Sequence, residues 1–155
     1  MIDDSAQYRT FIQSFTIQGN EFSTLSSAEE YRYHRERLIG FFLDLQGVVS
    51  STANSRMYNL VFDWIYPQYT PILIRCAEVF AYDPVVTGPL LKLLAELSLN
   101  KCSRLTFHPS SVNGLLLFKE VSKVLCTYGQ QILLSPGSLQ SEDLHKVIFF
   151  FSFSH

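Results

Sequence analysis

The chain has 155 residues, of which 47% are apolar and 17% are charged, and its formal net charge is −2. This balance gives the chain no overall electrostatic attraction to nucleic acid or to an anionic membrane. No apolar run approaches the ~20 residues that a membrane-spanning helix needs. The opening residues, with Asp3 and Asp4, lack the pattern of a signal peptide. The charged fraction lies below the usual value of about a quarter, which is typical of a segment flanked by more protein on both sides.

The first third of the sequence predicts two amphipathic helices. The first covers residues 4–17, and Gly19 with Asn20 is expected to end it. The second begins at Ser26 or Ser27, with Glu29 or Glu30 three positions on as in a capping box, and is expected to end at Gly47. The predicted buried stripes are Tyr8, Phe11, Ile12 and Phe15 in the first helix, and Tyr31, Leu38, Phe41, Phe42 and Leu45 in the second.

The middle of the chain predicts two antiparallel helices joined by a tight turn. One runs over residues 55–66 and stops before Pro67, because a proline disfavours helical backbone in the preceding residue. The next starts with Thr70 as its cap and Pro71 in its first turn. The residues expected to be buried are Met57, Leu60, Val61, Trp64 and Ile65 in the first, and Ile72, Leu73, Cys76, Ala77 and Phe80 in the second.

The last part predicts two longer helices and one short helix. Asp83 and Pro84 open a helix to about residue 100, which is followed by a connector over residues 101–111 with a possible short strand at 104–107. The next helix covers residues 112–133, and Ser141 caps a final short one. The predicted apolar stripes are Leu90, Leu91, Leu94 and Leu97, extended by Leu93 and Leu99, and then Leu117, Val121, Val124, Leu125, Tyr128 and Ile132.

The chain is therefore expected to be all-α, with amphipathic helices paired by short turns. The pairs recur at about 40 to 50 residues, within the range of HEAT repeats. Periodicity alone leaves a compact helical bundle open as an alternative, because a bundle gives a similar pattern.

Charged residues offer three candidate sites for a partner. Arg32, His34, Arg35 and Arg37 gather beside Glu36, either as a basic patch or, as the pattern favours, as a solvated helix face with local ion pairs. The other candidates are the lysine pair Lys119 and Lys123, which would suit an acidic partner but is typical of simple solvation, and the carboxylates Asp63 and Glu78, which are expected at the rims of apolar faces.

Sequence motifs for catalysis and metal binding are missing. The seven glycines form no phosphate-binding loop. The four histidines, His34, His108, His145 and His155, lack metal-ligand spacing. The cysteines Cys76, Cys102 and Cys126 are widely spaced and are expected to be reduced thiols packed inside an intracellular protein. A serine–histidine–acid set assembles in space and so stays open, but no pattern favours one. We therefore expect no enzyme, no cofactor and no metal.

A long run of the sequence resembles one family. It comprises residues 61–73 (Val-Phe-Asp-Trp-Ile-Tyr-Pro-Gln-Tyr-Thr-Pro-Ile-Leu), 82–84, 89–97 (Pro-Leu-Leu-Lys-Leu-Leu-Ala-Glu-Leu), 100–107, 110–123 and 128–133. This run is similar to the exportin-7 family, the Ran-binding exportins of the importin-β superfamily. Weaker resemblance at Gln7, Tyr8, Phe11 and residues 44–47 extends the match to about residues 3–147. The related exportin-4 is the nearest alternative within the superfamily.

The resemblance implies a HEAT-type α-solenoid. Residues 1–147 would be a partial repeat segment from the middle of a longer solenoid. Residues 148–155, rich in Phe and Ser, would be an atypical tail. Because this tail departs from the family pattern where another helix should continue, a mis-spliced or prematurely ended transcript is the hypothesis that explains it.

The resemblance also implies a transport function. Exportins bind protein cargo together with Ran-GTP, pass nuclear pore proteins and shuttle between nucleus and cytoplasm. In the superfamily the Ran contacts lie largely in N-terminal repeats that this sequence lacks, so no Ran- or cargo-binding residue is assigned. Two alternatives stay open: a freestanding helical scaffold or adaptor, and a non-functional truncated product whose apolar faces, such as residues 90–99, promote aggregation.

Overall fold

The computed structural model describes the backbone of residues 4–134 and the side chains of residue 10 and of residues 12–134. Within this range the regular structure is entirely helical. The helices are α1 (Asp4–Ser23), α2 (Ala28–Tyr33), α3 (Arg35–Ser51), α4 (Ser55–Ile65), α5 (Thr70–Val79), α6 (Pro84–Ser98) and α7 (Asn113–Leu134), with the short 3₁₀ turn η1 (Lys101–Ser103). None of these helices is long and apolar enough to cross a membrane. The helix predicted from Ser141 and the tail at 148–155 lie outside the described residues.

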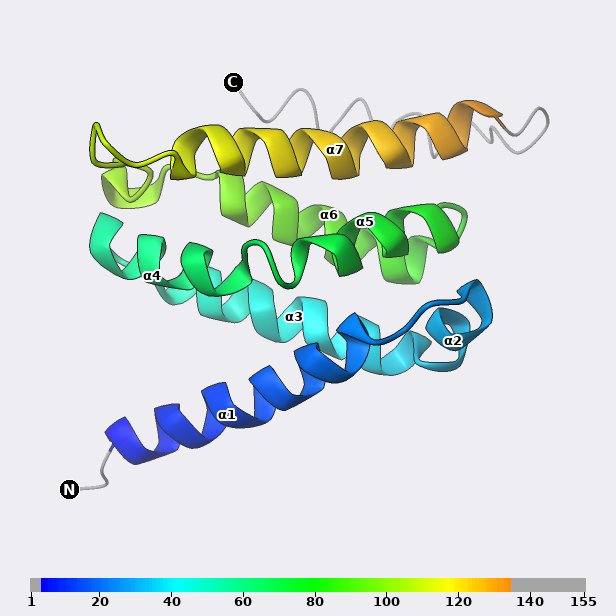
Figure 1. Cartoon of the computed structure of the whole chain (residues 1–155), viewed down its shortest axis with the longest axis horizontal. Coiled ribbons are helices and arrows are strands. Elements are labelled where there is room, and N and C mark those ends of the chain that lie inside the picture. Colours follow the sequence, from blue (N-terminus) through cyan, green and yellow to red (C-terminus); the bar gives the residue numbers. More distant parts are fainter. Residues whose placement is uncertain (1–3, 135–155) are drawn as a thin grey trace.

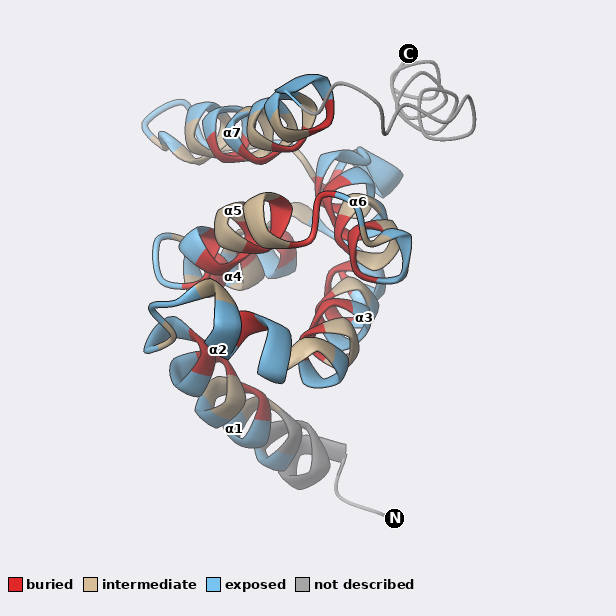
Figure 2. Cartoon of the chain, turned by 90° about the vertical axis from the view of Figure 1, so that its right-hand side faces the viewer, coloured by how far each residue is buried: buried red, intermediate tan, exposed pale blue. Residues whose placement is uncertain are grey.

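The helices form two stacked layers, as Figure 2 shows. One layer holds α1, then α4 with α5, then α7, and the other holds α3 and α6. Figure 1 shows the chain climbing this stack from α1 to α7, with α3 and α6 running in the same direction and α7 running back antiparallel to α6. Helix α3 is thus paired with α4–α5, and α6 with α7. This is the predicted segment of an all-α solenoid, in which each pair packs on its neighbours.

The predicted ends of the first two helices are wrong. Helix α1 passes through Gly19 to Ser23, and α3 passes through Gly47 to Ser51. Gly19 is needed for packing instead, because a Cβ atom there would lie 2.7 Å from Cε1 of the buried Tyr69. The second predicted helix is also broken into α2 and α3 at His34, which serves as both the C-cap of α2 and the N-cap of α3.

The capping residues predicted at the starts of the other helices are mostly confirmed. Ser27 and Glu30 form the predicted capping box at α2. The carboxylate of Asp83 accepts a hydrogen bond from the Val85 amide and caps α6. Thr70, by contrast, is the first residue of α5 rather than its cap, and its hydroxyl donates to the carbonyl of Pro67 at 3.2 Å.

The buried faces of α5, α6 and α7 largely match the predicted stripes. All five residues predicted for α5 are buried, and so are Leu90, Leu93, Leu94 and Leu97 in α6. In α7 the buried residues are Leu117, Glu120, Val124, Tyr128 and Ile132, and only Glu120 was not expected there. Leu99, which was expected to extend the buried surface of α6, is 51% exposed.

The predicted face of α4 is rotated relative to the observed one. Leu60 is 64% exposed and Met57 also faces solvent, whereas Tyr58 and Phe62 are buried with Ile65. The hydroxyl of Tyr58 donates to the carbonyl of Leu97 at 2.6 Å, which satisfies the polar end of this aromatic residue inside the core.

Trp64 lies at the edge of an aromatic cluster between the layers. It is half-buried, with its ring centroid 5.1 Å from that of Phe15 in α1 and 5.4 Å from that of Tyr69. Phe15 in turn stacks on Phe41 of α3 at 4.5 Å, and Phe41 meets Tyr69 edge-on at 6.2 Å. These rings join α1, α3 and α4–α5 into one core, which explains why Gly19 has no room for a side chain.

Arg104 is completely buried, and the strand predicted around it is absent from the structure. Its guanidinium donates to the carbonyls of Val49 at 2.9 Å, Glu96 at 2.5 Å and Leu99 at 2.9 Å, and to the carboxylate of Glu96 at 3.0 Å. Its Cζ atom also lies 5.5 Å from the ring centroid of Tyr58. The last carbonyls of a helix have no partner within the helix and carry partial negative charge. Arg104 therefore holds the C-terminal ends of α3 and α6 together, and we call this set of bonds the Arg104 clasp.

A second ion pair joins the N-terminal ends of the same two helices. Arg35, the first residue of α3, donates to both carboxylate oxygens of Asp83, the cap of α6, at 2.6 and 3.1 Å. This hydrogen bonding lowers the pKa of Asp83 and raises that of Arg35. Helices α3 and α6 are thus tied at both ends, with apolar packing between.

We expect replacement of Arg104 by methionine to be strongly destabilising. Arg104→Met keeps a similar volume but leaves buried carbonyls and the mostly buried Glu96 carboxylate without their partner, a loss of about 3–5 kcal/mol in the free energy of unfolding. Arg56→Met on the exposed surface of α4 is the control and should change this free energy by less than about 0.5 kcal/mol. Urea unfolding measures both variants, and equal stabilities would refute the clasp.

Two glycine substitutions should change stability in opposite directions. Gly19→Ala places a methyl group against a ring fixed by its neighbours and should cost about 1–3 kcal/mol. Gly47→Ala lies at an exposed helical position with no atom within 4 Å of the new Cβ, and should stabilise by roughly 0.5–1 kcal/mol. Thermal unfolding of the two variants compares them directly. A stabilising Gly19→Ala would mean that this glycine has no packing role.

The Asp83→Asn variant should lose a stabilisation that depends on pH. Asparagine keeps the helix cap but loses the charge, so the variant should be about 1 kcal/mol less stable at neutral pH. Because the pKa of Asp83 is lower in the folded state, its contribution is present above the ordinary Asp pKa of about 4 and is lost as the pH falls below it. Urea unfolding between pH 7 and 3 should show the difference shrinking below about pH 4. Asp44→Asn is the exposed-carboxylate control.

Candidate partner-binding surface

The basic cluster predicted on the second helix is largely taken up by ion pairs. Besides Arg35, which holds Asp83, Arg37 donates to both carboxylate oxygens of Glu21 at 2.8 and 2.6 Å and lies over the ring of Phe22. Arg32 is exposed on α2. The local ion pairing that was expected is present between Arg35 and Glu36 within α3. The pairs of Arg35 with Asp83 and of Arg37 with Glu21 also reach other parts of the fold, so the cluster stabilises the stack.

The other charged candidates lie at the surface. Asp63 is exposed and accepts a hydrogen bond from Asn113 at 2.8 Å. Glu78 is half-exposed and pairs with Arg75 at 2.6 Å, so both carboxylates occupy the predicted rim positions. In α7, Lys123 pairs with Glu120 at 2.9 Å, whereas Lys119 is exposed.

The three cysteines lie in different environments. Cys76 is buried in α5, and burial raises the pKa of its thiol, which disfavours the reactive thiolate. Cys102 and Cys126 are exposed, which contradicts the prediction that all three thiols are packed. Across the described residues no group of His, Cys, Asp and Glu side chains is arranged to hold a metal ion.

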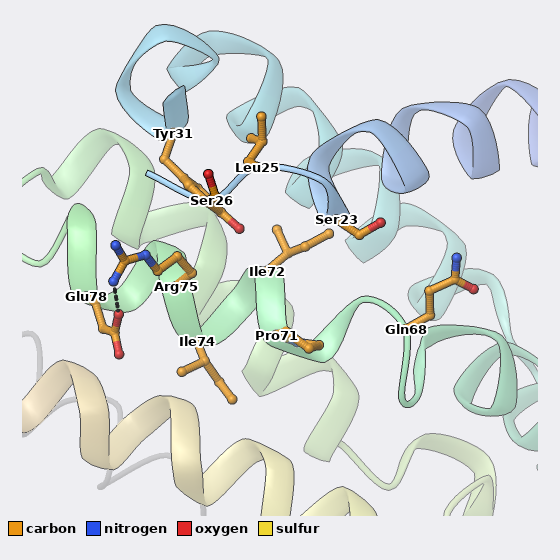
Figure 3. A pocket seen from close by; sticks show the side chains of 10 residues that line it. All are labelled: Ser23, Leu25, Ser26, Tyr31, Gln68, Pro71, Ile72, Ile74, Arg75 and Glu78. Carbon is orange, nitrogen blue, oxygen red and sulfur yellow. Dashed lines mark hydrogen bonds and ion pairs between the residues drawn. The ribbon is translucent and has the colours of Figure 1, made fainter. Parts of the chain in front are cut away.

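A concave surface lies between α5 and the connection from α1 to α2. It is a hollow of about 380 Å³, and Figure 3 shows the side chains that line it. We call it the α5 groove. Its lining residues are Ser23, Leu25, Ser26, Tyr31, Gln68, Pro71, Ile72, Ile74, Arg75 and Glu78. These residues come from the end of α1, the loop that follows it, α2, the turn before α5 and α5 itself.

One wall of the α5 groove is fixed by the capping box. The amides of Ser26 and Ser27 donate to one carboxylate oxygen of Glu30 at 2.7 and 3.0 Å, and the Glu30 amide donates back to the Ser27 hydroxyl at 3.1 Å. These bonds lower the pKa of Glu30, so its carboxylate stays charged at neutral pH. They hold the loop that carries Leu25 at the edge of the groove.

The remaining lining is apolar in the middle and polar at its ends. Ile72 is buried beneath the surface, while Ile74 is half-buried. Burial raises the pKa of Tyr31 to about 12, so its phenol is neutral at physiological pH. Figure 3 shows the Arg75–Glu78 pair at one end and Gln68 at the other. An apolar floor between balanced polar ends suits an uncharged side chain of another protein more than a highly charged ligand.

Sequence reasoning missed both the α5 groove and the Arg104 clasp. The groove depends on Leu25 and Ile74, which belong to no predicted stripe, and on a loop meeting a helix about 45 residues further along the chain. In the sequence, Arg104 is an arginine in a connector between two apolar helices. Such a position does not by itself indicate that the side chain is buried.

Comparisons with known proteins place the chain in a family. No protein-family model matches it, and no solved structure does. Ran-binding protein 17 of Mus musculus is 40% identical over 149 residues, which cover 94% of the chain and 13% of that protein. Exportin-7-B of Xenopus laevis is 37% identical over 145 residues, which cover 92% of the chain and 13% of that protein. Exportin-7 of Dictyostelium discoideum is 34% identical over 138 residues, which cover 88% of the chain and 14% of that protein.

The chain thus spans about one eighth of the length of these curated relatives. Its match runs through nearly all of its own residues, and the helical stack described above agrees with a repeat segment. The chain belongs to the exportin-7 and Ran-binding protein family, as a segment of that family's sequence.

Proposed function

We propose that the chain is a segment of a nuclear transport receptor that binds protein cargo together with Ran-GTP and shuttles between nucleus and cytoplasm. The observation that carries the proposal is the similarity to exportin-7 and Ran-binding proteins over about nine-tenths of the chain. The two-layer stack supports it, because a solenoid of helix pairs presents a long curved surface that can wrap around a protein.

Within such a receptor, this segment would act as part of a continuous binding platform. The ties at both ends of α3 and α6 hold two consecutive helix pairs in a fixed register. The α5 groove would then present its apolar floor to a side chain of the cargo. In the superfamily resembled here the Ran contacts lie largely in N-terminal repeats. The segment would therefore not contact Ran itself. The effect of Ran binding would reach it through the contacts between stacked helix pairs.

A freestanding scaffold is the second candidate, since the same stack can hold proteins together without Ran. Dependence on the nucleotide bound to Ran separates the two functions. A third possibility, a non-functional truncated product, predicts aggregation of the isolated chain. A monomeric chain that unfolds cooperatively would exclude it.

The test uses a chimera of mouse Ran-binding protein 17 in which this chain replaces the matching segment. The chimera and the isolated chain are immobilised and offered Ran loaded with GTP or GDP. We expect the chimera to capture Ran-GTP at least 10-fold better than Ran-GDP, and the isolated chain to capture neither. A correctly folded chimera that does not discriminate between the nucleotides would favour the scaffold.

Matched substitutions in the chimera test the role of the α5 groove. Leu25→Asp places a charge at the edge of the groove, whereas Leu60→Asp places one at an exposed apolar position on α4 outside it. We expect only Leu25→Asp to reduce the Ran-GTP-dependent capture of nuclear proteins, with Ran capture unchanged in both. Equal cargo capture by the two variants would remove the groove from the proposal.

A further inference from the structure

The connector between α6 and α7 begins with a turn of unfavourable backbone. Cys102 has φ 53° and ψ 32°, and Ser103 has φ 57°, so two consecutive residues have left-handed backbone. Among the described residues no other non-glycine residue has a positive φ. The Cβ atom of an L-residue lies too close to the following carbonyl oxygen in this region, a cost that glycine does not have. Both side chains are exposed, so their burial does not offset the cost.

Hydrogen bonds on both sides hold this turn in place. The amide of Leu105 donates to the side-chain oxygen of Asn100 at 3.0 Å, and the amide of Arg104 donates to the carbonyl of Lys101 at 3.1 Å. An unfavourable backbone persists only where its surroundings hold it, and such residues cluster where proteins switch between two states. The residue that follows the turn is Arg104 itself. The turn thus directs into the core the side chain that makes the Arg104 clasp.

The clasp is held or lost as a whole, because one guanidinium makes all of its bonds. Helices α3 and α6 run in the same direction (Figure 1), so their C-terminal ends lie together around Arg104. Solvent is close to this site, since Leu99 is 51% exposed and the side chain of Glu96 is partly exposed. The ion pair of Arg35 with Asp83 ties the opposite ends of the same helices and does not involve the turn. One end of the joint can therefore open while the other stays tied.

We propose that residues 100–105, together with the clasp, form a releasable latch on the joint between α3 and α6. In the closed state Arg104 holds the C-terminal ends of the two helices. In the open state Arg104 lies in solvent, Cys102 and Ser103 return to favourable backbone, and the C-terminal ends separate about the ion pair at the opposite ends. The backbone cost of the closed state brings the two states closer in free energy.

Opening of the latch changes the angle between consecutive helix pairs. Small rotations of this kind add up to the curvature of a solenoid. The latch would thus be a point at which the segment adapts its shape to a bound protein. That role in a transport receptor rests on the proposed function, whereas the latch itself is a property of this chain.

The first experiment measures how often the latch opens. Thr52 is 2% exposed and its Oγ1 lies 3.4 Å from the guanidinium, so Thr52→Cys provides a reporter of opening. Cys102 and Cys126 are replaced by serine, and the buried Cys76 reports global unfolding. Iodoacetamide alkylation of the 155-residue chain is followed at each thiol by mass spectrometry. Where the rate is proportional to the reagent concentration, it reports the population of the open form. We expect position 52 to react at least 10-fold faster than Cys76.

Glycine at the two left-handed positions should keep the latch closed. Cys102→Gly with Ser103→Gly removes the backbone cost of the closed state, so alkylation at position 52 should slow by a factor of roughly 5. Lys101→Gly with Ser110→Gly is the matched control, because both are exposed residues of the same connector and neither has a positive φ. The control should leave the rate unchanged or raise it, since glycine there only adds freedom to the open state.

A second measurement tests which end of the joint opens. Spin labels at Ser50 and Ser98 report the C-terminal ends of α3 and α6, and labels at Tyr33 and Val85 report the opposite ends; all four positions are exposed. Arg104→Lys replaces the fork of donors by a single ammonium group and should release the latch. We expect the distance distribution to widen for the first pair of labels and to stay the same for the second.

Any other result would overturn the proposal. Equal reactivity of position 52 and Cys76 would mean that the joint opens only when the whole chain unfolds. Alkylation that the two glycines do not slow would mean that the turn does not oppose closure. Label distances that widen at both ends, or at neither, would refute the pivot. Val49→Cys, at a position that is 0% exposed, is a second reporter should Thr52→Cys prevent folding. None of these measurements involves Ran or cargo, so their outcome is independent of the proposed function.

Discussion

The whole stack depends on the parallel packing of α3 against α6, and one buried guanidinium holds the C-terminal ends of these two helices together. Arg104 gathers carbonyls from the C-terminal ends of both helices, so the partial negative charges of two helix ends converge on one positive charge. Two C-terminal ends placed side by side would otherwise repel each other and leave carbonyls buried without partners. At the opposite ends Arg35 supplies a positive charge from α3 to the carboxylate that caps α6. The two contacts therefore set the register of the helices as well as their spacing.

Several ion pairs in this fold join different helices. Arg35 and Arg104 both hold α3 and α6 together, and Arg37 joins α3 to α1. A chain with few charged residues thus places several of them at joints between repeats. Apolar packing, which has little directional preference, supplies most of the burial, while the hydrogen-bonded ion pairs select one alignment. A receptor that wraps a protein needs such defined joints, because its curvature is the sum of many small rotations between neighbouring pairs.

Sequence reasoning predicted best where the signal is local. The caps at Ser27 and Asp83, the break before Pro67 and the buried stripe of α5 follow from neighbouring residues, and the structure confirms them. The prediction for Gly19 was wrong because the sequence does not distinguish a glycine that ends a helix from one that leaves space for the ring of a distant residue. The face of α4 was misread because Met57 and Leu60 add apolar surface beyond the buried side, so several rotations of the helix fit the pattern equally well.

Features that join segments far apart in the sequence could be identified only in the structure. The burial of Arg104 is decided by carbonyls 5 to 55 residues away, and the α5 groove by a loop and a helix that are separate in sequence. Nothing in the immediate neighbourhood of these residues distinguishes them from solvated arginines and ordinary surface leucines. The resemblance to a family correctly indicated the repeat architecture. It could not identify these contacts, because a family assignment indicates the fold but does not say which side chains contact each other.

The distribution of exposed apolar residues links the architecture to its use. In a closed bundle each helix would turn its apolar side inward, but here large apolar side chains remain exposed on α7. A stack of helix pairs has two ends, and each end shows the face that an additional pair would bury. The lateral surface, where the α5 groove lies, is built differently, with a shallow apolar floor and paired charges at its rim. Under the proposed function, the end surfaces would pack against neighbouring helix pairs, and the lateral surface would be the one available for another protein.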